Sequence, residues 1–149
     1  MQLENKSYVI ILQCDIVMER CSGYFCEKSL HEREGGFSKY PKDKQLRVIY
    51  MTCGGCCGRA TQRKVSHLIK KIGIKEKIPK DKIIVQMASC ITQDNHHGPM
   101  CPHVDYIKEL LDKINVDYRE DTWISTMSEK KRLSGEYKRA DHNVNPANP

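Results

Sequence analysis

Three short segments of the chain are almost continuously apolar and rich in valine and isoleucine. They cover residues 8–13, 46–52 and 82–89. This pattern is typical of strands in a parallel sheet that is covered on both faces, because neither side of such a strand meets water. A weaker segment at residues 116–119 is expected to add an edge strand.

Between these segments, apolar side chains recur at the spacing of an α-helix. One such stripe covers residues 57–71, and Gly73 is expected to end that helix. A second stripe covers residues 102–114, with Pro102 in the first turn, where a proline gives up no hydrogen bond. The segment 27–39 is a weaker helix candidate because two glycines interrupt it.

Strands that alternate with helices predict the fold class. We expect an α/β protein: a single three-layer domain with a mainly parallel sheet of about four or five strands in flavodoxin-like order and helices on both faces. The 149 residues match the size of one domain, which we place at residues 1–127. The polar and basic remainder, residues 128–149, is expected to be a disordered tail.

Charge and hydropathy limit the partners of this domain. The net charge is +6, but the basic clusters lack the aromatic or groove-reading motifs of a nucleic-acid binder, so nucleic acid is not an expected partner. No segment approaches the roughly 20 apolar residues of a membrane span. The apolar stretch at residues 8–12 is too short for a signal peptide. We therefore expect a cytoplasmic protein with no membrane partner.

Eight cysteines give the chain its candidate chemistry. Cytoplasmic thiols stay reduced, which favours metal or redox chemistry over structural disulfides. Cys14, Cys53 and Cys90 follow the first, second and third predicted strands. The carboxyl ends of parallel strands lie at one edge of a sheet, about 4.8 Å apart, so these thiols are expected to share a metal ion or a small cluster.

Loops at the same edge supply further donors. Cys53 and Cys56 form a CxxC pair whose two glycines allow a tight turn, and Cys56 lies near a helix start, where a thiolate is favoured. His103 adds an imidazole. The complete set of candidate metal ligands is Cys14, Cys21, Cys26, Cys53, Cys56, Cys90, Cys101 and His103.

Taken in order, these motifs resemble the CGGC domain family. The resemblance covers residues 8–123 and rests on Cys14 after a strand, Cys21-Ser-Gly-Tyr-Phe-Cys26, Gly36-Phe37, Thr52-Cys53-Gly-Gly-Cys56, Ala88-Ser-Cys90 and Cys101-Pro-His103. It implies a metal-binding domain, with zinc as the metal, and no established reaction. Two departures stand out: Cys57 replaces a frequent proline, and residues 121–123 lack a frequent histidine.

The sequence leaves three functions open. The first is binding of zinc, and the second is binding of an iron–sulfur cluster by four of the same thiolates. The third is thiol exchange by Cys53 and Cys56. Whether Cys57, His96 or His97 is a ligand stays open as well. No nucleophile elbow, phosphate loop or dinucleotide fingerprint is present in the sequence, so no reaction or substrate is predicted.

Overall fold

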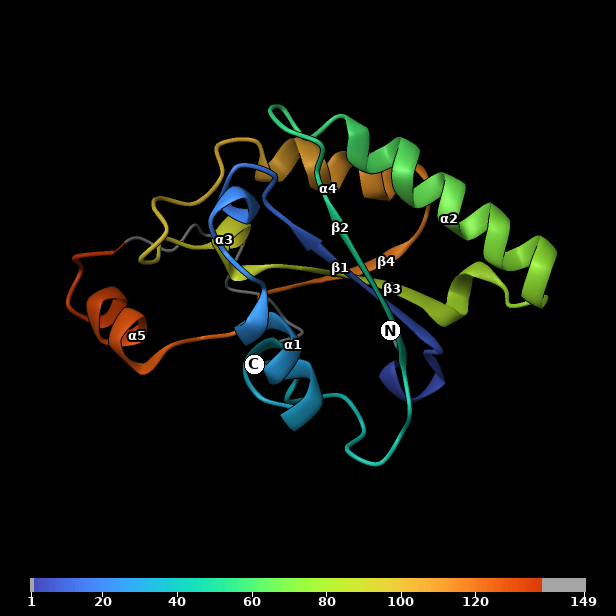
Figure 1. Cartoon of the computed structure of the whole chain (residues 1–149), viewed down its shortest axis with the longest axis horizontal. Coiled ribbons are helices and arrows are strands. Elements are labelled where there is room, and N and C mark those ends of the chain that lie inside the picture. The colour runs from blue at the N-terminus through green and yellow to red at the C-terminus, as the bar shows by residue number, and fades with distance from the viewer. Residues whose placement is uncertain (1, 138–149) are drawn as a thin grey trace.

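In the computed structural model, which describes residues 2–137, four parallel strands form one sheet in the order β2-β1-β3-β4 (Figure 1). The strands are β1 (Tyr8–Gln13), β2 (Arg47–Thr52), β3 (Ile83–Met87) and β4 (Asp117–Glu120). The predicted α/β class and flavodoxin-like order are confirmed, as is the edge position of β4. β1 and β3 occupy the middle of the sheet and are buried throughout.

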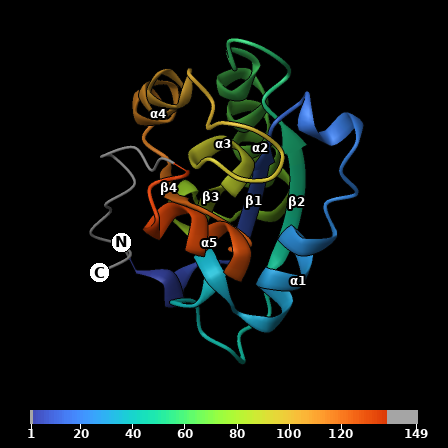
Figure 2. The ribbon, with the colours of Figure 1, turned by 90° about the vertical axis from the view of Figure 1, so that its left-hand side faces the viewer.

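Helices cover both faces of the sheet. α1 (Tyr24–Glu32) packs on one face, while α2 (Ala60–Glu76) and α4 (Val104–Lys113) pack on the other (Figure 2). The chain leaves β1 toward β2 in one direction and returns across β1 to β3 in the other, so right-handed crossovers place α1 and α2 on opposite faces. The remaining helical segments are α3 (Ser89–Thr92), α5 (Thr126–Leu133) and the 3₁₀ turns Leu3–Asn5, Val17–Glu19, Gly35–Phe37 and Lys80–Lys82.

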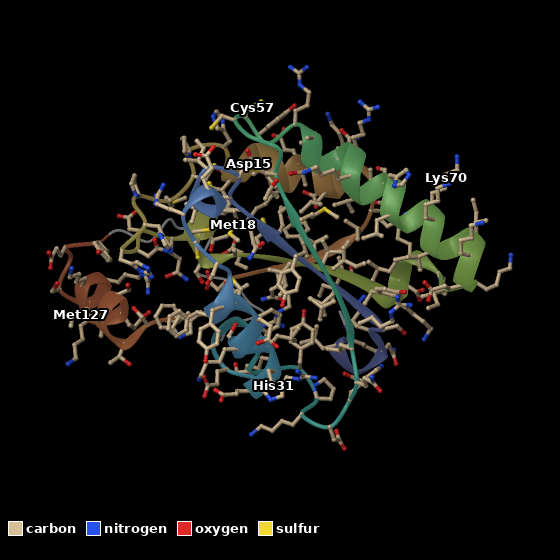
Figure 3. The ribbon with its side chains drawn as sticks, in the orientation of Figure 1. Asp15, Met18, His31, Cys57, Lys70 and Met127 are labelled. Atoms are coloured by element: carbon tan, nitrogen blue, oxygen red, sulfur yellow. The ribbon has the colours of Figure 1, made fainter. Side chains whose placement is uncertain are left out.

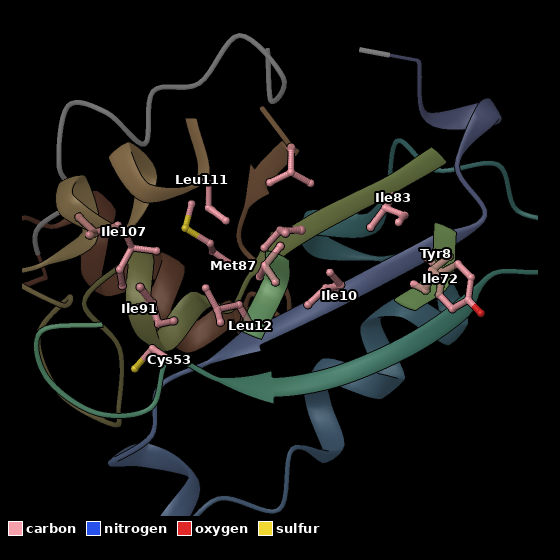
Figure 4. Close-up of a cluster of buried hydrophobic side chains, with 14 residues drawn as sticks. Tyr8, Ile10, Leu12, Cys53, Ile72, Ile83, Met87, Ile91, Ile107 and Leu111 are labelled. Atoms are coloured by element: carbon pink, nitrogen blue, oxygen red, sulfur yellow. The ribbon is translucent and has the colours of Figure 1, made fainter. Parts of the chain in front are cut away.

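Side chains of β1 alternate between two apolar cores. Ile10 and Leu12 pack with the residues of α2 and α4 (Figure 4), and Val9 and Ile11 pack with those of α1. Successive side chains of a strand point to opposite faces. Because both faces are covered, β1 needs apolar residues at every position, which explains its continuous pattern.

Two predictions for the second and third helices were wrong. Gly73 does not end α2; the helix continues to Glu76 and ends at Lys77, which adopts a left-handed conformation with φ of 59°. Pro102 lies outside α4, which begins at Val104. Helix ends depend on backbone conformation as well as on apolar spacing, and the spacing alone does not show that conformation.

A helix crosses the boundary predicted at residue 127 between the domain and its tail. α5 includes residues 128–133, and the side chain of Ser125 caps it by accepting a hydrogen bond from the backbone N–H of Ser128 at 2.9 Å. Arg132 then ties this helix to the domain through a 3.0 Å hydrogen bond to the carbonyl oxygen of Asp94. Residues 138–149 lie outside the described part of the chain. No helix in the described part has both the length and the apolar composition that a bilayer crossing requires.

Candidate functional site

All eight predicted ligands lie at the carboxyl edge of the sheet, but they line two cavities. The first, which we call the α4-side cavity, is lined by Cys14, Asp15, Ile16, Cys53, Gly55, Cys56, Cys57, Gly58, Cys101, His103 and Ile107. The second, the α1-side cavity, is lined by Gln13, Val17, Met18, Cys21, Gly23, Phe25, Cys26, Ser89, Cys90, Asn95, His96, His97, Thr122 and Trp123. Figure 3 labels Asp15 and Cys57 from the first cavity and Met18 from the second.

The alternation of β1 explains why Cys14 enters the α4-side cavity. Leu12 packs toward α2 and α4, the next residue Gln13 lines the α1-side cavity, and Cys14 returns to the first side. β1 and β2 are in register, with Gln13 opposite Thr52, so Cys53 is the neighbour of Cys14. The predicted proximity of these two strand-end cysteines is therefore a consequence of the register.

Cys90 does not occupy the equivalent position that the sequence suggested. β3 ends at Met87, which pairs with Leu12, so Ser89 is level with Cys14. Cys90 follows one residue later, inside α3, and lines the α1-side cavity. The prediction that Cys90 directly follows its strand was wrong, because β3 already ends at Met87. A shift of one residue along a strand reverses the face of a side chain, so Cys90 lines the other cavity. Its sulfur still lies close enough to the backbone of Cys14 for that backbone to lower its pKa.

The CxxC loop folds back onto the start of α2. The backbone N–H of Cys53 continues the ladder by donating to the carbonyl oxygen of Gln13 at 3.0 Å. Gly54 and Gly55 follow with φ of 80° and 102°, a backbone conformation that residues with a side chain rarely adopt. A Cβ on Gly54 would stand 2.5 Å from the Cβ of Ala60, so the tight turn requires glycine there.

Polar contacts from Thr52 hold this loop in place. Its hydroxyl donates to the carboxylate of Asp15 at 2.6 Å and accepts a hydrogen bond from the backbone N–H of Gly54 at 3.3 Å. The ammonium of Lys64 donates to the carbonyl oxygen of Thr52 at 2.9 Å. The loops after β1 and β2 are thus linked beside the cysteines they carry.

Electrostatics show that the thiols of the α4-side cavity interact. Burial raises the pKa of Cys101, although the backbone N–H of His103, 3.3 Å from the sulfur, lowers it. Cys14, Cys53 and Cys56 raise the same pKa further, because each negative sulfur disfavours another nearby. A cation in the cavity would remove this mutual repulsion.

The α1-side cavity holds the other three candidate cysteines. Burial raises the pKa of Cys90 to about 12, although the nearby backbone of Cys14 lowers it, and Cys26 and Cys21 raise it further. The sulfur of Cys26 is in hydrogen-bond contact with the hydroxyl of Thr122 at 3.2 Å. The thiols of Cys26 and Cys90, whose pKa values burial raises, are therefore protonated near neutral pH.

Aromatic side chains close one side of the α1-side cavity. The rings of Phe25 and Trp123 stack with centroids 3.9 Å apart, and His96 meets the edge of Trp123 at 6.3 Å. His97 lines the same cavity, and burial lowers the pKa of its imidazole. The two histidines that the sequence left open thus lie with Cys21, Cys26 and Cys90, apart from the CxxC pair.

The donor set of the α4-side cavity suits a soft metal ion in its chemistry. Thiolates and imidazole are the usual ligands of zinc. Within residues 2–137, however, no three side chains of His, Cys, Asp or Glu are already arranged to hold an ion. Metal binding at this edge would therefore require donor side chains that now lie apart in the cavity to move closer together.

Two further residues line these sites beside the predicted ligands. Cys57, whose role the sequence left open, lines the α4-side cavity beside Cys56. Gln13 lines the α1-side cavity with a side chain that is 3% exposed. A polar residue at the end of an otherwise apolar strand was the available signal for Gln13. No comparable signal showed the direction of Cys57.

The fold and these cavities define a cysteine-rich α/β protein of the flavodoxin-like topology with its candidate site at the carboxyl edge of the sheet. Residues 8–122 match the CGGC domain, and the chain belongs to this family. It is 28% identical over 116 residues to the uncharacterized protein MJ0582 of Methanocaldococcus jannaschii, an alignment that covers 72% of this chain and 80% of that protein. No solved structure matches the chain.

Proposed function

We propose that the chain binds one metal ion, zinc by the chemistry of its donors, in the α4-side cavity. The ligands are drawn from Cys14, Cys53, Cys56, Cys101 and His103. The observation that supports this proposal is that these four thiols and one imidazole, with Cys57 as a fifth thiol beside them, come from three separate loops and line a single small cavity. A closed zinc site takes four ligands, so the cavity offers enough donors for one.

The size of the cavity agrees with a single ion. Its volume is about 20 Å³, and a cavity needs roughly 10–15 Å³ to hold one water molecule. An organic substrate would not fit without rearrangement. A metal ion supplies positive charge that lets several neighbouring thiols ionise together.

The protein's own residues orient the donors. Hydrogen bonds from Thr52 link the loops that carry Cys14 and Cys53, and the helix dipole at the start of α4 lies next to Cys101 and His103. The N-terminus of a helix favours negative charge, which opposes the burial that raises the pKa of Cys101.

A metal analysis of the reduced protein tests this proposal. We expect the protein, purified without oxygen, to be colourless and to carry one zinc ion per chain. Cys53→Ser should weaken zinc binding by more than the roughly 10–100-fold that loss of an outer-shell partner costs. Cys21→Ser is the matched control, because Cys21 lines the α1-side cavity, and it should retain the ion.

Two other outcomes would replace the zinc proposal. Brown protein with equal iron and sulfide would indicate an iron–sulfur cluster on the same thiolates. Metal-free protein with a readily reduced Cys53–Cys56 disulfide would indicate thiol exchange. Equal zinc loss in Cys53→Ser and Cys21→Ser would contradict the assignment of the ion to the α4-side cavity.

A further inference from the structure

The α1-side cavity lies where an open α/β sheet binds its ligands. The connections from β1 and β3 diverge to opposite sides, since β1 leads to β2 and β3 leads to β4. Such a switch point leaves a crevice at the carboxyl ends of the two strands. Gln13 at the end of β1 and Cys90 just after β3 both line this cavity.

A buried hydrogen-bond donor in this cavity lacks an acceptor. Within residues 2–137, no atom accepts a hydrogen bond from Nε2 of Gln13, although this atom is buried. The amide lies near enough to the sulfur of Cys26 to lower its pKa, but it is not aligned for a hydrogen bond. A buried donor without an acceptor costs roughly 1–3 kcal/mol. A ligand with an acceptor oxygen would remove that cost, whereas a cation would not.

The thiol beside this amide is neutral. Burial raises the pKa of Cys26, and the hydrogen-bond contact with Thr122 and the nearby Gln13 amide only partly offset that rise. The walls of the cavity are largely apolar, with Val17, Phe25 and Trp123 among them. An apolar site with a neutral thiol disfavours an anion, because a buried negative charge is costly without a cationic partner and burial lowers the pKa of His97 in the wall.

The volume sets the size of the ligand. The cavity measures about 60 Å³. At roughly 10–15 Å³ for each water-sized group, this leaves room for about four such groups. The ligand is thus small and uncharged, carries an acceptor oxygen, and meets a thiol.

From these features we infer that the α1-side cavity binds a small carbonyl compound, which Cys26 captures while Gln13 holds its oxygen. The sulfur of Cys26 bonds to the carbonyl carbon as the carbon–oxygen π bond opens. The thiol proton ends on the oxygen, which accepts a hydrogen bond from the Gln13 amide. The product is a hemithioacetal, and the reversible addition needs neither oxidant nor reductant.

The single tryptophan of the chain makes this binding directly measurable. Trp123 lines the cavity and is the only tryptophan in the sequence. Titrating the reduced full chain with propionaldehyde, which has four heavy atoms, should change Trp123 fluorescence to saturation. Propan-1-ol has the same number of heavy atoms but no carbonyl group, and it should leave the emission unchanged. An equal response to both compounds would overturn the inference.

Variants separate the two residues and the two cavities. Cys26→Ser should abolish the saturable response, and Gln13→Leu should weaken binding by about tenfold, the worth of one hydrogen bond to a buried group. Cys56→Ser, in the α4-side cavity, should bind like the wild type. A response that survives in Cys26→Ser would overturn the inference.

A second measurement uses the wild-type protein alone. In the reduced, metal-free protein, propionaldehyde should protect Cys26 from alkylation by iodoacetamide and leave Cys56 reactive, as peptide mapping would show; unprotected Cys26 would overturn the inference. The zinc content of Cys26→Ser distinguishes this inference from the proposed function. It should equal that of the wild type, and zinc loss would instead make the cavity part of the metal site. If no variant bound zinc, the proposed function would be contradicted, but the propionaldehyde titration would still test this inference.

Discussion

At the scale of single residues, Gln86 organises the interior beside the α1-side cavity. It is fully buried in β3 and uses both ends of its amide. Its Nε2 donates to the carbonyl oxygens of Gly36, Glu120 and Asp121 at 3.0, 3.1 and 2.7 Å, and its Oε1 accepts from the hydroxyl of Tyr40 at 2.7 Å. One side chain thus connects β3, the end of β4 and the turn after α1.

We expect Gln86→Leu to destabilise the protein by at least about 3 kcal/mol, because it leaves buried carbonyl and hydroxyl groups without partners, at roughly 1–3 kcal/mol each. Urea denaturation followed by circular dichroism would measure the loss. Gln45→Leu is the control, since Gln45 is exposed in the loop before β2 and its replacement should change stability little. Equal stability of the two variants would show that the network contributes nothing.

The sequence shows Gln86 only as a polar residue within an apolar strand. Its partners are 34 to 50 positions away in the chain, and spacing gives no information about them. The cysteines were easier to place, because a strand end fixes which edge of the sheet a following residue reaches. Which cavity each sulfur enters depends on one-residue differences in register, as Cys90 demonstrates.

At the scale of elements, strand cores were predictable and helix ends were not. β1 was predicted to the residue and β2 to within one residue at its start, because buried strands need continuous apolar side chains. α2 extended beyond its expected end because Gly73 takes a helical conformation there. The left-handed backbone that does end the helix belongs to Lys77, which no propensity marks as a stop.

The position of Gly73 inside α2 predicts a stabilising substitution. A Cβ on Gly73 would meet only the carbonyl oxygen of Ile78, at 4.0 Å. Alanine is favoured over glycine in a helix interior by roughly 0.5–1 kcal/mol. We therefore expect Gly73→Ala to raise the free energy of unfolding by about that amount, as measured in urea.

Gly36→Ala serves as the contrasting variant for that experiment. A Cβ on Gly36 would lie 2.0 Å from the carbonyl oxygen of Asp121, a backbone atom that cannot move aside cheaply. This variant should be clearly destabilised. A loss of stability in Gly73→Ala as well would mean that α2 does end near Gly73.

At the scale of the whole molecule, the sheet divides the cysteines of this CGGC protein between two cavities. Right-handed crossovers could be predicted from the alternating pattern, and they bring all candidate ligands to one edge. The division between faces could not, because it depends on the exact last residue of β3 and on α3. Of the seven cysteines predicted as ligands, four line the α4-side cavity and three line the α1-side cavity, and Cys57 lies beside the set of four.

This division predicts that the two cavities bind their ligands independently. Trp123 stacks on Phe25 in the α1-side cavity, while the proposed zinc ligands line the cavity on the opposite face. Zinc added to the reduced, metal-free protein should therefore leave Trp123 emission unchanged, and propionaldehyde should then change it by the same amount as without zinc. Ligands that do not alter each other's sites have no coupling free energy.

The contact between Cys14 and Cys90 is where such independence would fail. The backbone of Cys14 lies close enough to the sulfur of Cys90 to lower its pKa, so movement of Cys14 onto a metal ion would reach the α1-side cavity first at that point. A zinc-dependent change in Trp123 emission that Cys90→Ser removes would show coupling through this contact. A change that persists in Cys90→Ser but disappears in Cys26→Ser would instead place zinc in the α1-side cavity, against both proposals.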